Sequence, residues 1–410
     1  MNDRKFKVAT LGCRTNQYES EAYASQLRAL GYTEATHDEK ADICIVNTCT
    51  VTASADSHSR HQIRQLANAN PGSELVVTGC LAESLPPIEG VTHIVPNSQK
   101  ENLLSVLFPY KEDLPEFKID QFGSHSRAFV KVQDGCNSFC TYCIIPYVRG
   151  RSRSRPVADI LQEIRGLAHQ GYKEVVLTGI NVGDFVGENK ETLADLIRAV
   201  DQVDGLERIR LSSIDPDEVD HNLMSAIVEG KKTCHSMHIV LQSGSNVILK
   251  RMNRKYTKQI FMETIERLKK ENPHFTFTTD VIVGFPGETE SDFEETLDVM
   301  RSVKFAKVHM FPYSERKRTR AALFPNKVPS HIISERKQRT LREAEKIAFD
   351  LRSQFVGQTL KVLIETEDPP SGHSENFLPV ILENSKATRN QIVDVLCFDN
   401  SPQGLLGSGQ

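Results

Sequence analysis

Apolar segments alternate with amphipathic segments along the first hundred residues of the chain. Near-continuous apolar runs, each typical of a buried strand, occupy four short ranges: 7–12, 41–48, 74–79 and 91–96. Helical periodicity follows the first two runs, over 17–30 and 56–69. This alternation predicts a small doubly wound α/β domain, in which a parallel sheet is covered by helices on both faces.

A second alternating series begins near residue 128. The pattern predicts six further strands, at 128–133, 174–179, 208–213, 238–242, 276–283 and 306–313. Helical stretches separate these strands, for example at 156–170, 191–201, 258–271 and 290–302. Six strand–helix pairs predict a partial or full βα barrel, and catalytic residues of such barrels lie at the carboxyl ends of the strands.

The pattern changes again towards the C-terminus. One charged helix over 333–350 is followed by three alternating apolar segments with turns between them, at 360–366, 375–382 and 391–398. Short strands without helices predict a small all-β barrel of the OB type. The predicted organisation is an N-terminal domain over 1–110, a linker over 111–127, a barrel domain over 128–350 and a β domain over 351–410.

Composition narrows the class of protein. The hydrophobic fraction of 39% and the charged fraction of 25% are ordinary for a globular domain. We find no apolar signal segment at the N-terminus and no run of membrane-spanning length, so we expect a cytoplasmic protein without a membrane partner. Thiols stay reduced in that compartment, and nine cysteines there indicate metal or redox chemistry more than disulfides.

Three of the cysteines lie within eight positions, in the sequence DGCNSFCTYC. Cys136, Cys140 and Cys143 follow directly after the first predicted barrel strand, where an active site belongs. Structural zinc usually needs four ligands in paired knuckles, and no second knuckle accompanies this group. An iron–sulfur cluster held by three thiolates keeps one iron open for a substrate or cofactor.

Three other cysteines are distant in sequence but share a position relative to the predicted strands. Cys13, Cys49 and Cys80 each come just after a strand of the first domain. The carboxyl ends of neighbouring parallel strands line one crevice, so these thiols are candidates for a second three-thiolate cluster. Cys44 and Cys397 lie inside apolar strands and are interpreted as packing residues.

The spacing CxxxC-x-aromatic-C resembles the signature of the radical S-adenosylmethionine (SAM) enzymes. That resemblance implies that the open iron binds the amino and carboxylate groups of SAM, with Tyr142 packing near the adenine. Residues at the predicted strand ends are candidates for the SAM pocket, although LTGI also fits a plain strand-to-loop turn. These candidates are Thr178, Gly179, Asn181, Ser212, Ser213 and Gln242.

Longer motifs resemble the methylthiotransferase family, among them GCRTNQYES, NTCTVT, CIIPYVRGRSRSR and DVIVGFPGETE. The resemblance implies an N-terminal methylthiotransferase domain, a radical SAM domain and a C-terminal TRAM domain. It also implies two [4Fe-4S] clusters and two SAM molecules. One SAM methylates a sulfur held at the N-terminal cluster. The other is cleaved to a radical that removes hydrogen from carbon 2 of an adenine before the methylthio group is transferred.

Within that family the motifs look most like the branch that acts on threonylcarbamoyladenosine in tRNA. Two alternative substrates keep the same chemistry: isopentenyladenosine in tRNA and an aspartate of a ribosomal protein. A zinc-stabilised RNA-binding protein is the alternative without chemistry. The expected partners are tRNA, a sulfur donor and a reductant such as flavodoxin or ferredoxin.

Two basic runs flank the predicted catalytic region, at 148–155 and 315–320. Clustered basic residues are typical of a surface that contacts a phosphate backbone. The predicted RNA-binding residues are Arg149, Arg151, Arg153, Arg155, Arg316, Lys317, Arg318 and Arg320. An arginine of the first run equally fits a contact with the carboxylate of SAM or of the threonyl group.

Overall fold

The computed structural model describes residues 4–123, 125–383 and 385–409, and the chain divides into two compact units. Positions 1–3, 124, 384 and 410, which fall within the predicted domains and linker, lie outside the described residues. The first unit comprises the N-terminal residues up to Gly123 together with 134–153 and 314–322. The second unit comprises 124–133, 154–313 and 323–410. The loop that carries Cys136, Cys140 and Cys143 therefore belongs to the same unit as the N-terminal sheet.

The first unit is built on a five-stranded parallel sheet in the order β2-β1-β3-β4-β5. Its strands are β1 (Lys5–Thr10), β2 (Thr33–Glu34), β3 (Ile43–Thr48), β4 (Glu74–Gly79) and β5 (His93–Ile94). Its helices and turns are α1 (Arg14–Ala29), α2 (Ala53–Ala69), η1 (Ala82–Ser84), η2 (Asn97–Asn102), α3 (Leu103–Leu107) and α4 (Ile145–Val148). The turn η5 (Arg320–Leu323) begins in this unit.

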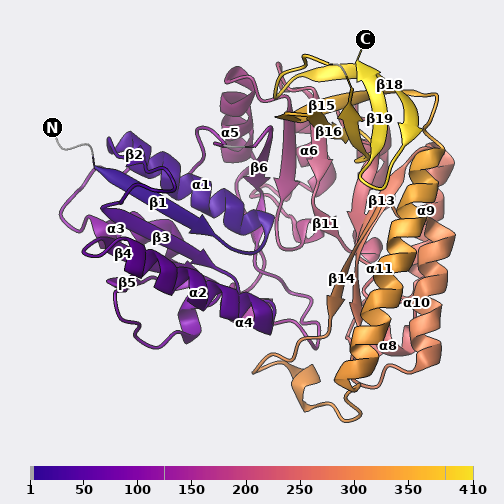
Figure 1. Ribbon diagram of the computed structural model, residues 1–410, viewed down its shortest axis with the longest axis horizontal. Helices are drawn as coiled ribbons and strands as arrows, with labels where there is room; N and C mark the ends of the chain where they lie inside the picture. The colour runs from indigo at the N-terminus through magenta and orange to yellow at the C-terminus, as the bar shows by residue number, and fades with distance from the viewer. Residues whose placement is uncertain (1–3, 124, 384, 410) are drawn as a thin grey trace. The chain divides into compact units, whose positions relative to one another are not determined.

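Both faces of this sheet are buried, because successive side chains of a strand point to opposite faces. Ile43 and Ile45 pack in one core with Leu27 of α1, whereas Cys44 and Val46 pack in another with Ile63 of α2. Helices α1 and α2 thus cover opposite faces of the sheet (Figure 1). The predicted doubly wound domain is confirmed, and Cys44 is buried as expected.

Part of the predicted linker packs on the first unit. The ring of Phe117 lies 5.2 Å from that of Tyr23, and Ile119 and Phe122 are buried. The sequence pattern also missed β2, because an exposed edge strand of two residues carries no periodicity.

The second unit contains the strands of the predicted barrel, in two parallel sheets with the orders β10-β9-β6 and β11-β12-β13-β14. These strands are β6 (Arg127–Lys131), β9 (Glu174–Thr178), β10 (Arg208–Leu211), β11 (Ser213–Ile214), β12 (Ser236–Ile239), β13 (Thr276–Val283) and β14 (Lys307–Pro312). Two short strands, β7 (Gln133–Asp134) and β8 (Arg153–Ser154), lie where the chain passes from one unit to the other. The helices are α5 (Val157–His169), α6 (Leu193–Asp201), α7 (His221–Val228), α8 (Asn246–Arg251), α9 (Lys258–Glu271), α10 (Glu290–Val303) and α11 (Ser330–Ser353), with turns η3 (Val182–Asp184) and η4 (Pro216–Glu218).

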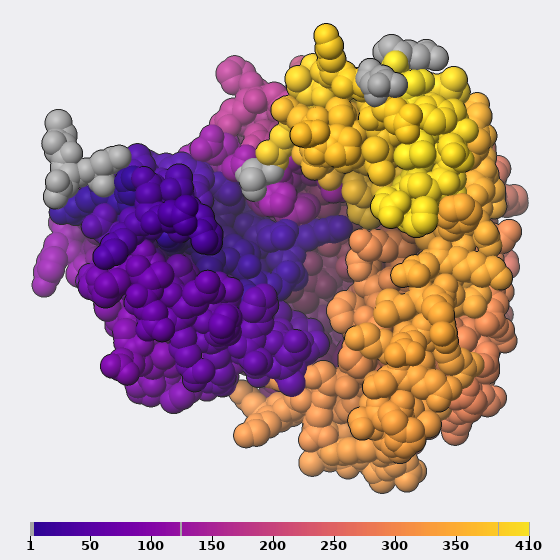
Figure 2. All heavy atoms as spheres, viewed as in Figure 1, coloured from indigo at the N-terminus to yellow at the C-terminus, as the bar shows by residue number. Residues whose placement is uncertain are grey.

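The C-terminal residues form a closed barrel in the order β15-β16-β17-β19-β18, as the predicted OB-type fold requires. Its strands are β15 (Thr359–Glu367), β16 (Pro370–Ser374), β17 (Pro379–Leu382), β18 (Ile392–Asn400) and β19 (Leu405–Gly409). The predicted strand over 375–382 was wrong at its start, because Phe377 has a positive φ of 59° and lies in a turn. Figure 2 shows these yellow residues packed against the orange residues of the same unit.

A buried ionic cluster joins this small barrel to β9 and β10. Glu174, at the start of β9, is fully buried, and its Oε1 lies 2.9 Å from Nε of Arg210. Arg208 and Arg210 also donate hydrogen bonds to backbone carbonyl groups of the small barrel, at Lys361 (2.7 Å) and Glu375 (3.1 Å). Burial alone would raise the pKa of Glu174, but the guanidinium groups outweigh it and lower that pKa to about 2.

Replacing Glu174 by glutamine should therefore destabilise the folded protein by about 3–5 kcal/mol, because buried arginines would lose their counter-ion. The folded-state pKa lies below the ordinary value of 4.5, so Glu174 stabilises the protein fully above pH 4.5. That contribution is lost as the pH falls from 4.5 towards 2, and the difference between wild type and Glu174→Gln should shrink over this range. Urea unfolding followed by circular dichroism measures both effects.

The matched control is Glu207→Gln, which removes a carboxylate from an exposed pair with Lys173 (3.0 Å). Exposed pairs contribute little, so this change should leave stability almost unaltered. Equal losses of stability in the two variants would contradict a stabilising role for the buried cluster.

Among the described residues, no helix combines the length and the apolar character that crossing a membrane requires.

Candidate functional site

Three neighbouring strands of the first unit end at one edge of the sheet, and a cysteine follows each of them. Cys49 and Cys80 come directly after β3 and β4, whose ends pair at Thr48 and Gly79. Cys13 lies three residues after β1, at the position that precedes α1. The sheet thus brings together cysteines that are distant in sequence.

Close approach of two of these cysteines depends on a glycine. Gly12 has a φ of 97°, which favours glycine, and a Cβ at this position would lie 2.9 Å from Sγ of Cys49. Burial raises the pKa of the Cys80 thiol to about 12, the nearby Arg149 guanidinium opposes this rise, and the Cys13 and Cys49 thiols add to it. All three thiols are therefore near enough to influence one another.

The donor set fits a [4Fe-4S] cluster with one open iron, because three thiolates leave the fourth iron without a protein ligand. Cys49 and Cys80 are buried, whereas Cys13 is exposed, so the group is open to solvent on the Cys13 side. The described residues hold no group of three or more His, Cys, Asp or Glu side chains that suits one metal ion. Cluster thiolates bind different irons and so surround a larger volume than the ligands of a single ion.

The second cysteine group lies on the loop 134–153. The backbone N–H of Cys136 donates to the carbonyl of Gly150 (3.2 Å), which closes the loop on itself. A Cβ on Gly135 would lie 2.0 Å from the carbonyl oxygen of Arg151, so this closure requires glycine. Cys136, Cys140 and Cys143 are all partly exposed, and Tyr142 is partly exposed as well. Three accessible thiolates without a fourth again fit a cluster with an open iron.

Arg149 does not lie on the surface as an RNA-binding residue would. Its side chain is fully buried, with Nη1 3.0 Å from Oε1 of Glu19 and 2.8 Å from Oδ1 of Asp134. Lys100 is buried beside it and pairs with both carboxylates. The predicted RNA contact of Arg149 is therefore corrected, because a phosphate has no access to this guanidinium group.

The remaining basic residues divide into paired and exposed ones. Arg155 pairs with Glu163 (2.5 Å), and Arg316 pairs with Asp56 (2.6 Å). Arg153 is half-exposed and pairs with Asp134. The other four predicted residues are exposed and lie in the first unit: Arg151, Lys317, Arg318 and Arg320.

These exposed residues come from two segments that the structure joins. The guanidinium of Arg318 lies 5.1 Å from the ring centre of Tyr147, in α4 of the cysteine loop. The backbone N–H of Ala321 donates to the carbonyl of Thr141 (2.8 Å). The four side chains Arg151, Lys317, Arg318 and Arg320 are hereafter called the basic surface.

The residues predicted to bind SAM follow barrel strands of the second unit. Thr178 ends β9, and a hydrogen bond from the Ser212 N–H to Leu177 (3.0 Å) ties the end of β10 beside it. Gln242, after β12, has a positive φ of 62°. Oγ1 of Thr178 and Oε1 of Gln242 are buried and have no hydrogen-bond partner among the described residues, although buried polar atoms are usually paired.

The other predicted pocket residues are fixed by neighbours. A Cβ on Gly179 would lie 2.8 Å from Oε1 of Gln133, so glycine is needed for this close approach. The side chain of Asn181 donates to Glu218 (2.7 Å), and Ser213 begins β11. Sequence reasoning missed Glu218, whose pKa is raised to about 7, chiefly by burial and then by the carboxylate of Asp215. The sequence signal available for it is the acidic segment DPDE after β11, which our predictions from the sequence did not use.

Comparison with known proteins finds two matching families and relatives that align with nearly the whole chain. The Radical SAM superfamily matches residues 130–300, and the family described as "Uncharacterized protein family UPF0004" matches residues 5–96. The chain is 49% identical, over 98% of its length, to threonylcarbamoyladenosine tRNA methylthiotransferase MtaB of Chlamydia pneumoniae, of which 97% is covered. It is 36% identical, over 97% of its length, to a tRNA-2-methylthio-N(6)-dimethylallyladenosine synthase of Caldicellulosiruptor saccharolyticus, of which 88% is covered.

A solved structure shares the fold. The radical S-adenosylmethionine methyltransferase TsrM from Kitasatospora setae superposes with a TM-score of 0.54 at 12% identity. The match covers 76% of this chain and 72% of that one, and at this identity the likeness concerns the fold alone.

The superfamily match spans the loop of Cys136, Cys140 and Cys143 and the barrel strands through β13, and a methylthiotransferase relative covers nearly the whole chain, so the chain is a radical SAM enzyme. Sequence identity to methylthiotransferases over nearly the whole length narrows the class of enzyme. The chain belongs to the radical SAM methylthiotransferase family. Membership implies a [4Fe-4S] cluster and SAM as cofactors. It also overturns the alternative of a zinc-stabilised RNA-binding protein without chemistry.

Proposed function

We propose that this enzyme adds a methylthio group to carbon 2 of N6-threonylcarbamoyladenosine next to the anticodon of tRNA. The observation that carries this substrate is the identity of 49% to the relative named for it, against 36% to the relative named for dimethylallyladenosine. The alternatives are isopentenyladenosine in tRNA and an aspartate of a ribosomal protein. They differ in the substrate and keep the same chemistry.

Each cysteine group holds one [4Fe-4S] cluster in this proposal. Cys136, Cys140 and Cys143 bind three irons of the first and leave the fourth for SAM, and Tyr142 packs near the adenine. Cys13, Cys49 and Cys80 bind three irons of the second and leave one position for the sulfur that is transferred. When bound, the first cluster with SAM supplies a carbon-centred radical, and the second supplies sulfur.

The strand ends of the second unit bind SAM in this proposal. The hydroxyl of Thr178 donates a hydrogen bond to a polar group of SAM or accepts one from it, and Oε1 of Gln242 accepts one. Gly179 and Asn181, with Ser212 and Ser213, shape the same pocket. Reductive cleavage of one SAM consumes one electron, so a reductant such as flavodoxin or ferredoxin is a partner, and a sulfur donor restores the sulfur after each turnover.

The tRNA backbone binds the basic surface in this proposal. Replacing Arg318 and Arg320 by glutamine should weaken tRNA binding and reduce the slope of log K against log salt by about two, because each arginine neutralises one phosphate. Fluorescence anisotropy at several salt concentrations measures this slope. SAM cleavage in the absence of tRNA should be unchanged.

The control removes two exposed charges elsewhere, at Lys231 and Lys270 of the second unit. This double glutamine variant has the same net charge as Arg318→Gln/Arg320→Gln but keeps the basic surface. Identical salt slopes for the two double variants would contradict a specific role for the basic surface.

Nucleoside mass spectrometry tests the substrate. The gene is expressed in a host without methylthiotransferases of its own, and total tRNA is digested to nucleosides. We expect a new peak of 2-methylthio-threonylcarbamoyladenosine. A peak of 2-methylthio-isopentenyladenosine instead would overturn the substrate and keep the chemistry. No new nucleoside, from protein that holds both clusters, would favour the ribosomal protein.

A further inference from the structure

A buried charged network lies next to Cys80 in the first unit. Glu19 and Asp134 supply two carboxylates, and Lys100 and Arg149 supply two cations that pair with both. All four side chains are at most 4% exposed. Burying four charges is costly unless each is paired in a fixed geometry, so the network holds its members rigidly.

A further cation, the half-exposed Arg153, borders the network and pairs with Asp134 (2.9 Å). One of the two buried cations also contacts a thiol, because Nε of Arg149 donates to Sγ of Cys80 at 3.3 Å. The guanidinium of Arg149 would therefore act on a buried Cys80 thiolate both as a positive charge and as a hydrogen-bond donor.

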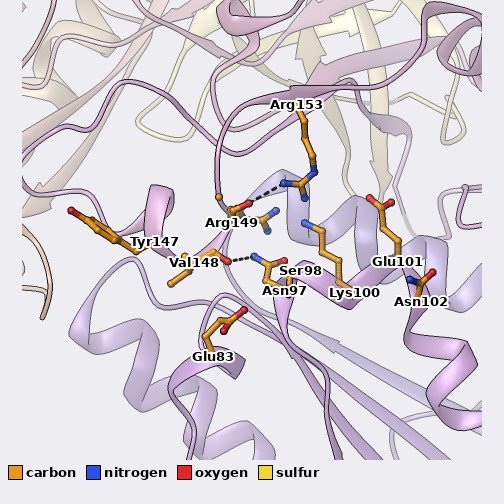
Figure 3. A pocket seen from close by; sticks show the side chains of 11 residues that line it. Glu83, Asn97, Ser98, Lys100, Glu101, Asn102, Tyr147, Val148, Arg149 and Arg153 are labelled. Carbon is orange, nitrogen blue, oxygen red and sulfur yellow. Dashed lines mark hydrogen bonds between the residues drawn. The ribbon is translucent and has the colours of Figure 1, made fainter. Parts of the chain in front are cut away.

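The backbone around Arg149 is fixed as well. Figure 3 shows Asn97 donating to the carbonyl of Val148 (3.0 Å) and Arg153 donating to the carbonyl of Arg149 (2.9 Å). The next residue, Gly150, accepts the hydrogen bond from Cys136. The side chain of Arg149 thus contacts one cysteine group, while its backbone belongs to the loop that carries the other.

A second contact supports a site built around Cys80. Asn97, which is 1% exposed, has its Nδ2 3.9 Å from Sγ of Cys80. Asn97 and Arg149 both line one pocket of about 540 Å³ (Figure 3). Polar groups that contact metal ligands orient them and tune the metal.

We propose that Arg149 is a positioning residue that sets the reduction potential of the N-terminal cluster. Hydrogen bonds to ligand sulfur and nearby positive charge both favour the reduced, more negative cluster. Arg149 supplies both through Cys80, and Glu19, Asp134 and Lys100 keep its guanidinium in place. This inference rests on the proposed second cluster, and it assigns Arg149 to that cluster instead of to RNA.

The test uses the full-length chain with Cys136, Cys140 and Cys143 replaced by alanine, so that only the N-terminal cluster contributes to the measured signal. After anaerobic reconstitution with iron and sulfide, the midpoint potential of the N-terminal cluster is measured by a redox titration monitored by electron paramagnetic resonance. The rate of iron loss to a chelator is a second measurement. Arg149→Gln and Arg149→Lys are compared with Arg151→Gln, which changes an exposed arginine of the same loop.

We expect a more negative potential in Arg149→Gln, a smaller shift in Arg149→Lys and none in Arg151→Gln. Iron loss should be about 10- to 100-fold faster in Arg149→Gln. If Arg149→Gln does not fold, the Arg149→Lys comparison decides. Equal potentials and equal iron loss in all variants would overturn the role of Arg149. Failure of the parent chain to bind about four irons would instead overturn the second cluster itself.

Discussion

Replacing Cys140 by alanine is expected to abolish SAM cleavage and methylthiolation together. The proposed barrel cluster would lose one of its three thiolate ligands, and the iron that binds SAM would no longer be held. Iron content should fall by about half, because the N-terminal cysteines are untouched. Liquid chromatography of anaerobic reactions with a chemical reductant measures 5′-deoxyadenosine and the modified nucleoside in the same sample.

The matched control for this change is Cys44→Ala. Cys44 is also a cysteine of the chain, but it is buried within β3 among apolar side chains and does not follow the end of a strand. It should lower stability slightly and leave both products unchanged. Formation of 5′-deoxyadenosine by Cys140→Ala at the wild-type rate would contradict the assignment of the barrel cluster.

Replacing Cys13 by alanine is expected to separate the two halves of the reaction. Cys13 is exposed, so its loss should not disturb the core of the sheet. SAM cleavage to 5′-deoxyadenosine should continue, because Cys136, Cys140 and Cys143 remain. The methylthiolated nucleoside should disappear, because the N-terminal cluster can no longer supply sulfur. The same chromatographic assay measures both results.

Two other results of this experiment would contradict the account. Methylthiolated product from Cys13→Ala would show that the N-terminal cluster is dispensable. Loss of 5′-deoxyadenosine as well, in protein with an intact barrel cluster, would show that the two cysteine groups do not have separate roles.

The position of the six cysteines could be predicted from the sequence because it depends on local pattern and on general topology. Cys49 and Cys80 follow strands whose apolar runs are unambiguous, and the ends of parallel strands meet at one edge of a sheet. The spacing of Cys136, Cys140 and Cys143 is itself local. The roles of these thiols as cluster ligands stay a prediction.

The roles of single basic residues could not be predicted, because charge in a sequence does not reveal its partner. Arg149 pairs with Glu19 across 130 positions, and Arg316 pairs with Asp56 across 260 positions. Both lie in runs that also contain exposed members, such as Arg151 and Lys317. The burial of Glu19 could not be predicted from the hydrophobic pattern of α1. The helix is amphipathic whether this carboxylate is buried or exposed.

The fold was predicted least well where strands are short. β2 has two residues and β19 is rich in glycine, so neither has a clear alternation. The segment 134–153 was expected to belong with the barrel strands that flank it. It belongs instead to the first unit, because its buried Arg149 and Asp134 pair with Glu19 and Lys100.

The most direct test of the account is the stoichiometry of the purified enzyme on tRNA that carries threonylcarbamoyladenosine. Mass spectrometry would quantify 2-methylthio-threonylcarbamoyladenosine, S-adenosylhomocysteine and 5′-deoxyadenosine in one anaerobic reaction. The account predicts all three, with one S-adenosylhomocysteine for each methylthio group and at least as much 5′-deoxyadenosine. Formation of 5′-deoxyadenosine and S-adenosylhomocysteine without the methylthiolated nucleoside, from enzyme that holds both clusters and a sulfur source, would contradict it.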